Sequence, residues 1–174
     1  MRARDLEQLY DYGYWANQRL FAVLTTLTPD EFTRPVAGNH GSVRHTLVHM
    51  LSAEWGWLER CGGPPRGPKL DPDDYRNVES VVTTWNRVER DMRQFLSTQN
   101  DDTLAQSVEF SLGSGPKNSI PRGILLQHAA IHGVHHRGQV ALLLRMLGHT
   151  PGDFDLVFYA GAAPLVAAAP APRA

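Results

Sequence analysis

The chain alternates between long stretches in which apolar residues recur every three or four positions and short stretches rich in Gly, Pro, Asn and Asp. Apolar recurrence at that spacing predicts amphipathic helices, because residues three and four apart lie on the same helix face. The pattern predicts four long helices, at about residues 5–27, 42–60, 77–98 and 121–147. Boundary residues agree with these limits: Thr28-Pro29 stops the first helix, Ser42 and Asn77 or Ser80 are N-caps, Pro121 suits a first helical position, and Gly148 follows the last helix.

The segments between the helices predict how the bundle is connected. Residues 61–75 are rich in Pro, Gly and Asp and read as a long loop, either a lid or a plain connection. Residues 104–112 and 117–120 flank the turn signal Gly113-Ser114-Gly115, which suits a short hairpin before the last helix. We therefore expect an all-α fold, a four-helix bundle with a long crossover connection, with one domain over residues 1–160 and an Ala/Pro-rich tail over 161–174.

The composition limits which binding partners and which cellular location we expect. The 174 residues carry a formal net charge of −1, contain no Lys/Arg block and contain no apolar run long enough to cross a membrane. The first residues lack the apolar core of a secretory signal, and Cys61 is the only cysteine. We expect a cytoplasmic protein that binds neither nucleic acid nor membranes.

The last predicted helix carries an unusual concentration of histidines. His128, His132, His135 and His136 are four of the eight histidines in the chain. At about 100° per residue, all four lie within roughly 100° of one another on one helix face. Leu125, Leu143 and Met146 share that face, so it is predicted to point into the bundle.

Several inward-facing imidazoles favour a metal site over ordinary core histidines, because an ion accepts their lone pairs and keeps the rings neutral. Spacing alone leaves three pairs open, His128/His132, His132/His135 and His132/His136. A third ligand should come from the second helix, where His49 is preferred over His45 because His49 lies along a flank of small residues. The Glu that acts as base in H-E-x-x-H peptidases is replaced by Gly133, which argues against that class.

Three separate segments together resemble the DinB/YfiT-like family of metal-dependent enzymes. They are YWANQRL at Tyr14–Leu20, SVRHTLVHMLSAEWGWLER at Ser42–Arg60 and HGVHHRGQVALLLRMLG at His132–Gly148. The resemblance implies a four-helix bundle with a long crossover. It also implies one metal ion held by His49 and by the H-x-x-x-H pair His132 and His136.

The same resemblance implies chemistry. Three histidines leave a coordination position open on a tetrahedral ion, which is typical of catalytic sites. Zinc or nickel is favoured, with manganese or iron as alternatives. Relatives of this kind resemble transferases that use low-molecular-weight thiols. We therefore expect a small-thiol-dependent S-transferase acting on electrophilic small molecules, with a hydrolase or a non-catalytic metal-binding stress protein as the alternatives.

Further residues are expected near the site or at an interface. Gln139 faces inward near His136, His45 lies close to His49, and Tyr14 could form part of a pocket wall. A homodimer is expected from the resemblance and from apolar surfaces that include Trp15 and Trp85.

Overall fold

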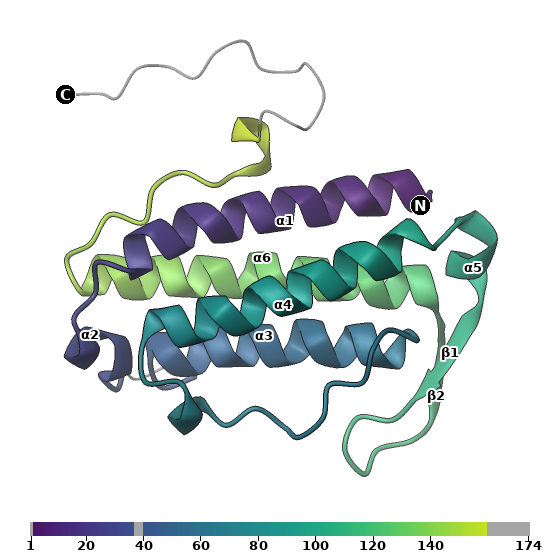
Figure 1. Ribbon diagram of the computed structural model, residues 1–174, viewed down its shortest axis with the longest axis horizontal. Helices are drawn as coiled ribbons and strands as arrows, with labels where there is room; N and C mark the ends of the chain where they lie inside the picture. Colours follow the sequence, from purple (N-terminus) through teal and green to yellow (C-terminus); the bar gives the residue numbers. More distant parts are fainter. Residues whose placement is uncertain (1, 37–39, 160–174) are drawn as a thin grey trace.

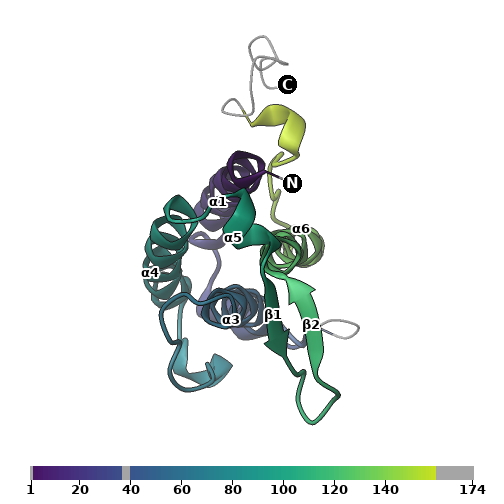
Figure 2. The same cartoon turned by 90° about the vertical axis from the view of Figure 1, so that its right-hand side faces the viewer.

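The computed structural model describes residues 2–36 and 40–159, and within them the chain forms a bundle of four long helices. Helix α6 packs against α1 and α3, and α4 packs against the same two helices from the other side. Viewed along the bundle, α1 and α3 therefore occupy opposite corners (Figure 2). The predicted four-helix bundle is confirmed. The long helices are α1 (Ala3–Leu24), α3 (Val43–Arg60), α4 (Val78–Ser97) and α6 (Arg122–Met146).

Short elements fill the connections between the long helices. Strands β1 and β2 pair antiparallel, with Ser107 opposite Pro121 and Phe110 opposite Asn118, so the predicted hairpin is present. None of the helices in the described ranges has both the length and the apolar character needed to cross a membrane. The short elements are α2 (Pro29–Thr33), the 3-10 turn η1 (Pro72–Asp74), α5 (Asp101–Ala105), β1 (Ser107–Phe110), β2 (Asn118–Pro121) and the 3-10 turn η2 (Leu156–Phe158).

The connection between α3 and α4 is the long crossover. Helices α3 and α4 run in the same direction, so residues 61–77, here called the crossover segment, return along the length of α3 (Figure 1). Arg66 at one end of the segment donates from Nη1 to the carbonyl oxygen of Ser52 at 3.2 Å. At the other end, Asp73 accepts from Arg44 Nη2 at 2.6 Å. The segment is thus fastened to α3 at two points.

Several helix boundaries follow the predicted caps. Ser42 Oγ accepts from the His45 amide at 3.1 Å, and Asn77 Oδ1 accepts from the Ser80 amide at 3.0 Å. Gly148 adopts a positive φ of 86° directly after α6, a conformation that favours glycine. Side-chain capping therefore explains where α3 and α4 begin.

Three boundaries differ from the sequence prediction. Helix α1 ends at Leu24, because Thr25–Leu27 tighten into a turn before Pro29. Pro121 is the N-cap rather than the first helical residue, because its extended backbone (ψ 135°) still pairs with Ser107. The stretch predicted to begin the hairpin at residue 104 starts later, at Ser107, because Asn100 caps the short helix α5, which includes Leu104 and Ala105. The predicted tail at 161–174 lies outside the described residues.

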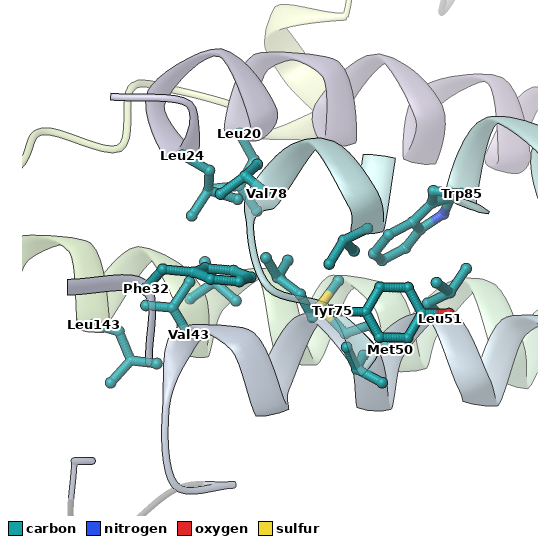
Figure 3. Packing of buried hydrophobic residues seen from close by; sticks show 14 of the residues in the cluster. Leu20, Leu24, Phe32, Val43, Met50, Leu51, Tyr75, Val78, Trp85 and Leu143 are labelled. Carbon is teal, nitrogen blue, oxygen red and sulfur yellow. The ribbon is translucent and has the colours of Figure 1, made fainter. Parts of the chain in front are cut away.

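Apolar packing holds the long helices together on both sides of the histidines. Figure 3 shows Leu20 and Leu24 of α1, Met50 and Leu51 of α3 and Trp85 of α4 meeting in one cluster. A second cluster occupies the other end of the bundle, where Trp57 and Leu58 pack near Leu125, Leu126 and Ala129. Burial of this apolar surface fixes α3 and α6 against each other.

Candidate metal centre

Three histidine side chains meet in the middle of the seam between α3 and α6. His49 Nε2 lies 3.2 Å from His132 Nε2 and 3.1 Å from His136 Nε2, and the last two atoms are 2.9 Å apart. His132 and His136 share a face because they are four residues apart on α6. We call His49, His132 and His136 the histidine triad.

The geometry of the histidine triad fits a metal ion. Ligand nitrogens about 2.0–2.1 Å from a tetrahedral zinc ion lie roughly 3.3–3.4 Å from one another, close to the observed separations. The rings of His49 and His136 are inclined at 76°, those of His132 and His136 at 61°, and those of His49 and His132 at 50°. Lone pairs lie in the ring planes, so strongly inclined rings can direct three lone pairs to one point.

The electrostatic environment keeps the triad neutral. Burial, together with the charge of neighbouring histidines, lowers the pKa of His49 and of His132 to about 4. Burial also lowers the pKa of His136. At neutral pH the three rings are therefore uncharged, and each has one nitrogen with a lone pair, which is the state that a metal ion requires.

A fourth histidine, His40, lies beside the triad and was missed by the sequence analysis. Its ring stacks on His49 at 4.1 Å between centroids with an interplanar angle of 20°, and lies 5.0 Å from His136. One nitrogen from each of His40, His49 and His136 lies within 4.8 Å of the others. His40, His49 and His136 thus form a second group of three histidines that could hold an ion, and it shares His49 and His136 with the triad.

Comparisons with known proteins show the family of the chain. The model of the DinB family matches residues 1–172. The chain belongs to the DinB family. It is 25% identical in sequence to Protein DinB of Bacillus subtilis (strain 168) over 161 residues, an alignment that covers 87% of this chain and 92% of that protein. The resemblance inferred from the three sequence segments is thereby confirmed.

Two further comparisons agree. The uncharacterized protein YizA of the same organism is 22% identical over 144 residues, covering 83% of this chain and 89% of that protein. The crystal structure of a DinB-like protein from Bacillus cereus ATCC 10987 superposes with a TM-score of 0.73 at 22% identity, covering 87% of this chain and 97% of that one. At this identity the crystal structure supports the bundle fold alone.

In this DinB-family chain, Gln139 holds one ring of the triad in place. Its Oε1 accepts from His136 Nδ1 at 2.6 Å, which fixes the tautomer with the free lone pair on Nε2. Its amide Nε2 lies 3.2 Å from His135 Nε2. Gln139 thus orients a ring of the triad from outside it.

Replacing Gln139 by alanine is expected to lower the affinity for a divalent metal by about 10–100-fold, the usual effect of losing such an outer partner. Gln139→Glu keeps an acceptor oxygen and should retain most of the affinity. Competition with a chromophoric chelator measures both constants. Equal, unchanged affinities in the two variants would show that Gln139 does not orient His136.

The other two residues predicted to lie near the metal site, His45 and Tyr14, are in different parts of the bundle. His45 Nδ1 lies 2.8 Å from Ser42 Oγ, and its side chain lines a pocket of about 210 Å³ that also touches His40 and His49. Tyr14 lies elsewhere, on a separate small cavity that the triad does not line. The structure therefore brings His45, but not Tyr14, to the candidate centre.

The two remaining histidines of α6 surround the triad without converging on it. His128 is exposed and packs edge-on against Trp57 at 5.2 Å between centroids. His135 is also exposed and packs edge-on against His136 at 4.8 Å. Of the three pairs left open by spacing, His132/His136 has the converging geometry.

Tyr14 belongs to a polar cluster in the bundle interior. Its hydroxyl donates to Glu54 Oε1 at 2.7 Å, and Trp85 Nε1 donates to Glu54 Oε2 at 3.2 Å. Burial raises the pKa of Glu54 despite these two donors. The buried Arg137 donates to Asn17 Oδ1 at 3.0 Å, which makes it a contact between α6 and α1.

Gly133 takes part in the same contact. A Cβ at this position would lie 3.2 Å from Arg137 Nη1. Position 133 therefore faces the Arg137 side chain, and as glycine it carries no carboxylate of the kind that acts as base in an H-E-x-x-H peptidase.

Proposed function

We propose that this DinB-family chain is a metal-dependent enzyme, a small-thiol-dependent S-transferase acting on electrophilic small molecules. Its metal ligands are His49, His132 and His136. The observation that carries the proposal is the convergence of the Nε2 atoms of these three histidines, which lie 2.9–3.2 Å from one another. Three protein ligands with an open position are the pattern of catalytic rather than structural sites.

The three histidine nitrogens are the reason why we propose a metal-activated nucleophile. A divalent ion, zinc or nickel by preference and manganese or iron as alternatives, would supply positive charge that lowers the pKa of a thiol or water at the open position. Because all three imidazoles are neutral, the protein does not cancel that charge. The three histidines of the triad would hold the ion, and Gln139 fixes the orientation of the His136 ring.

A thiol suits the site better than water does. No carboxylate is available at position 133 to act as a base, and a thiol that has lost its proton attacks without further help. In the proposed transfer to an alkyl halide or an epoxide, the thiol proton goes to solvent, a bond forms between sulfur and carbon, and the halide or alkoxide oxygen leaves that carbon with the electron pair of its bond. With an unsaturated carbonyl compound no group leaves: sulfur bonds to the β-carbon, the π bond breaks, and the α-carbon takes a proton from solvent. A metal-dependent hydrolase and a non-catalytic metal-binding stress protein remain the alternatives.

The test is consumption of thiol by metal-loaded protein in the presence of a panel of alkyl halides, epoxides and unsaturated carbonyl compounds. We expect catalysed consumption that is lost after chelation and in His136→Ala, while circular dichroism stays helical. His128→Ala, altered on the same helix outside the triad, should remain active. Turnover that persists after complete metal removal would overturn the mechanism, and hydrolysis without thiol would favour the hydrolase.

We also propose that the chain forms a homodimer, although the surfaces first considered for it need correction. Trp85 is only 2% exposed, because it packs on Phe21 inside the bundle. Trp15 is partly covered by Tyr159. Exposed apolar side chains lie instead along α6, at Ile124, Ile131, Val134, Leu142 and Met146.

Light scattering should give a particle of twice the chain mass of 19.4 kDa at micromolar concentrations. Ile131→Lys places a charge in the exposed apolar row of α6 and should shift the particle toward the monomer. A mass of 19.4 kDa across the whole range for the unaltered chain would reject the homodimer.

A further inference from the structure

A pocket lies directly beside the histidine triad, between α3 and the crossover segment. Its volume is about 210 Å³. His40 and His49 form the part of its wall that also belongs to the candidate metal centre. Lys69 and Leu70 of the crossover segment also line it. A molecule in this pocket, here called the crossover pocket, would lie against a metal ligand.

The crossover pocket has fixed walls. The crossover segment is held to α3 by Arg66, which donates to Ser52 Oγ at 3.0 Å, and by the Arg44–Asp73 ion pair at 2.6 Å. These two contacts lie on either side of Lys69 along the chain. The two contacts therefore hold the backbone on both sides of Lys69 against α3, while the Lys69 side chain is exposed.

The charges around the crossover pocket are one-sided. Lys69 is the one permanently charged side chain among the described lining residues, and none of them is acidic. The crossover segment also carries Asp71, Asp73 and Asp74, none of which lines the pocket. Asp73 pairs with Arg44, and Asp71 Oδ1 accepts from the Asp73 amide at 2.9 Å. Among the described residues, Lys69 has no carboxylate partner. Its ammonium group is available to a ligand.

The volume limits the ligand as well. About 210 Å³ corresponds to roughly seven water molecules at about 30 Å³ each. This is below the range of about 300–1,000 Å³ that is typical of drug-sized ligands. Apolar walls from Val48, Leu70 and Pro72 suit a short carbon chain between two polar ends.

We infer that the crossover pocket binds the carboxylate end of a small anionic thiol, with Lys69 as the residue that selects for the negative charge. The thiol end then points toward His49 and the candidate metal centre. This inference rests on the proposed function and adds the substrate class: the thiol carries a carboxylate a few bonds from its sulfur.

The experiment uses protein loaded with Co²⁺, because thiol binding to that ion gives a sulfur-to-cobalt absorption band that needs no turnover. The full chain is titrated with 3-mercaptopropionate, with its neutral methyl ester and with the cationic thiol cysteamine. We expect the carboxylate to bind about five- to tenfold more tightly than the ester, as for one charge-assisted contact at a partly exposed site. Cysteamine should bind most weakly.

Lysine variants separate the effect of Lys69 from chelation of the ion by the carboxylate itself. Lys69→Met should remove the preference for 3-mercaptopropionate, and Lys69→Arg should keep it. Lys117→Met alters the only other lysine of the chain, which is exposed next to the hairpin, and should change nothing.

The outcomes are distinct. If all three thiols bind equally, or if the preference persists in Lys69→Met, the inference about Lys69 is overturned while the proposed thiol chemistry stands. If no thiol produces the band in cobalt-loaded protein, the proposed function is overturned, and this inference falls with it.

Discussion

Replacing His132 by alanine is expected to lower the affinity for zinc by more than the roughly 10–100-fold that loss of an outer partner causes. The reason is direct: Nε2 of His132 lies 2.9 Å from that of His136 and 3.2 Å from that of His49, so its loss leaves two nitrogens where three converge. The affinity is measured by competition with a chelator of known constant. Circular dichroism should show that the helices persist.

His128→Ala is the matched control for that experiment. His128 lies one turn earlier on α6, is exposed and contacts Trp57, so its removal should change the zinc affinity by less than about threefold, which corresponds to under 1 kcal/mol. Equal retention of zinc in both variants would show that the triad is not the metal site.

Replacing Glu54 by alanine is expected to destabilise the protein by about 3–5 kcal/mol. The substitution leaves the hydroxyl of Tyr14 and the indole N–H of Trp85 without their acceptor, and each buried unpaired donor costs about 1–3 kcal/mol. The space vacated by the side chain adds a cavity cost. Denaturant unfolding measures the loss in the free energy of unfolding.

Two further variants serve as comparisons for Glu54→Ala. Glu54→Gln keeps an acceptor for one of the two donors and should cost clearly less than alanine does. Glu79→Ala removes an exposed glutamate from α4 and should stay within about 0.5 kcal/mol of the unaltered protein. A Glu54→Ala protein as stable as Glu79→Ala would mean that the polar cluster does not support the bundle.

The sequence predicted the architecture well, because each long helix carries its own periodic apolar face and its own caps. The stop at Thr28-Pro29 and the caps at Ser42 and Asn77 are local signals that need no tertiary information. Pro121 shows the limit of such signals. It suits the first turn of a helix, but pairing with Ser107 across the hairpin kept its backbone extended.

The candidate site was predicted in part. Spacing of four residues made the His132/His136 pair available, yet it could not exclude His128 or His135, since all four rings lie on one broad face. Only the crossing of α3 and α6 decides which nitrogens meet His49. His40 could not be found from periodicity, because its position depends on the turn at Gly41, where φ is 102°.

The polar cluster was also beyond the sequence analysis. Glu54 lies on a helix that shows ordinary amphipathic spacing, and nothing in its neighbours along the chain indicates a partner. Its donors come from α1 and α4, so they become visible only when three helices are assembled. The same assembly buries Trp85, which the sequence alone suggested as part of an exposed surface.

The central claim is that one divalent ion is held by the histidine triad with a coordination position left for a small molecule. Anomalous diffraction at the zinc absorption edge, from crystals of zinc-loaded protein, tests it most directly. We predict a single peak about 2.0–2.1 Å from Nε2 of His49, His132 and His136, with the fourth ligand not from the protein. A peak held by other residues, or closed by a fourth protein nitrogen such as that of His40, would contradict the account.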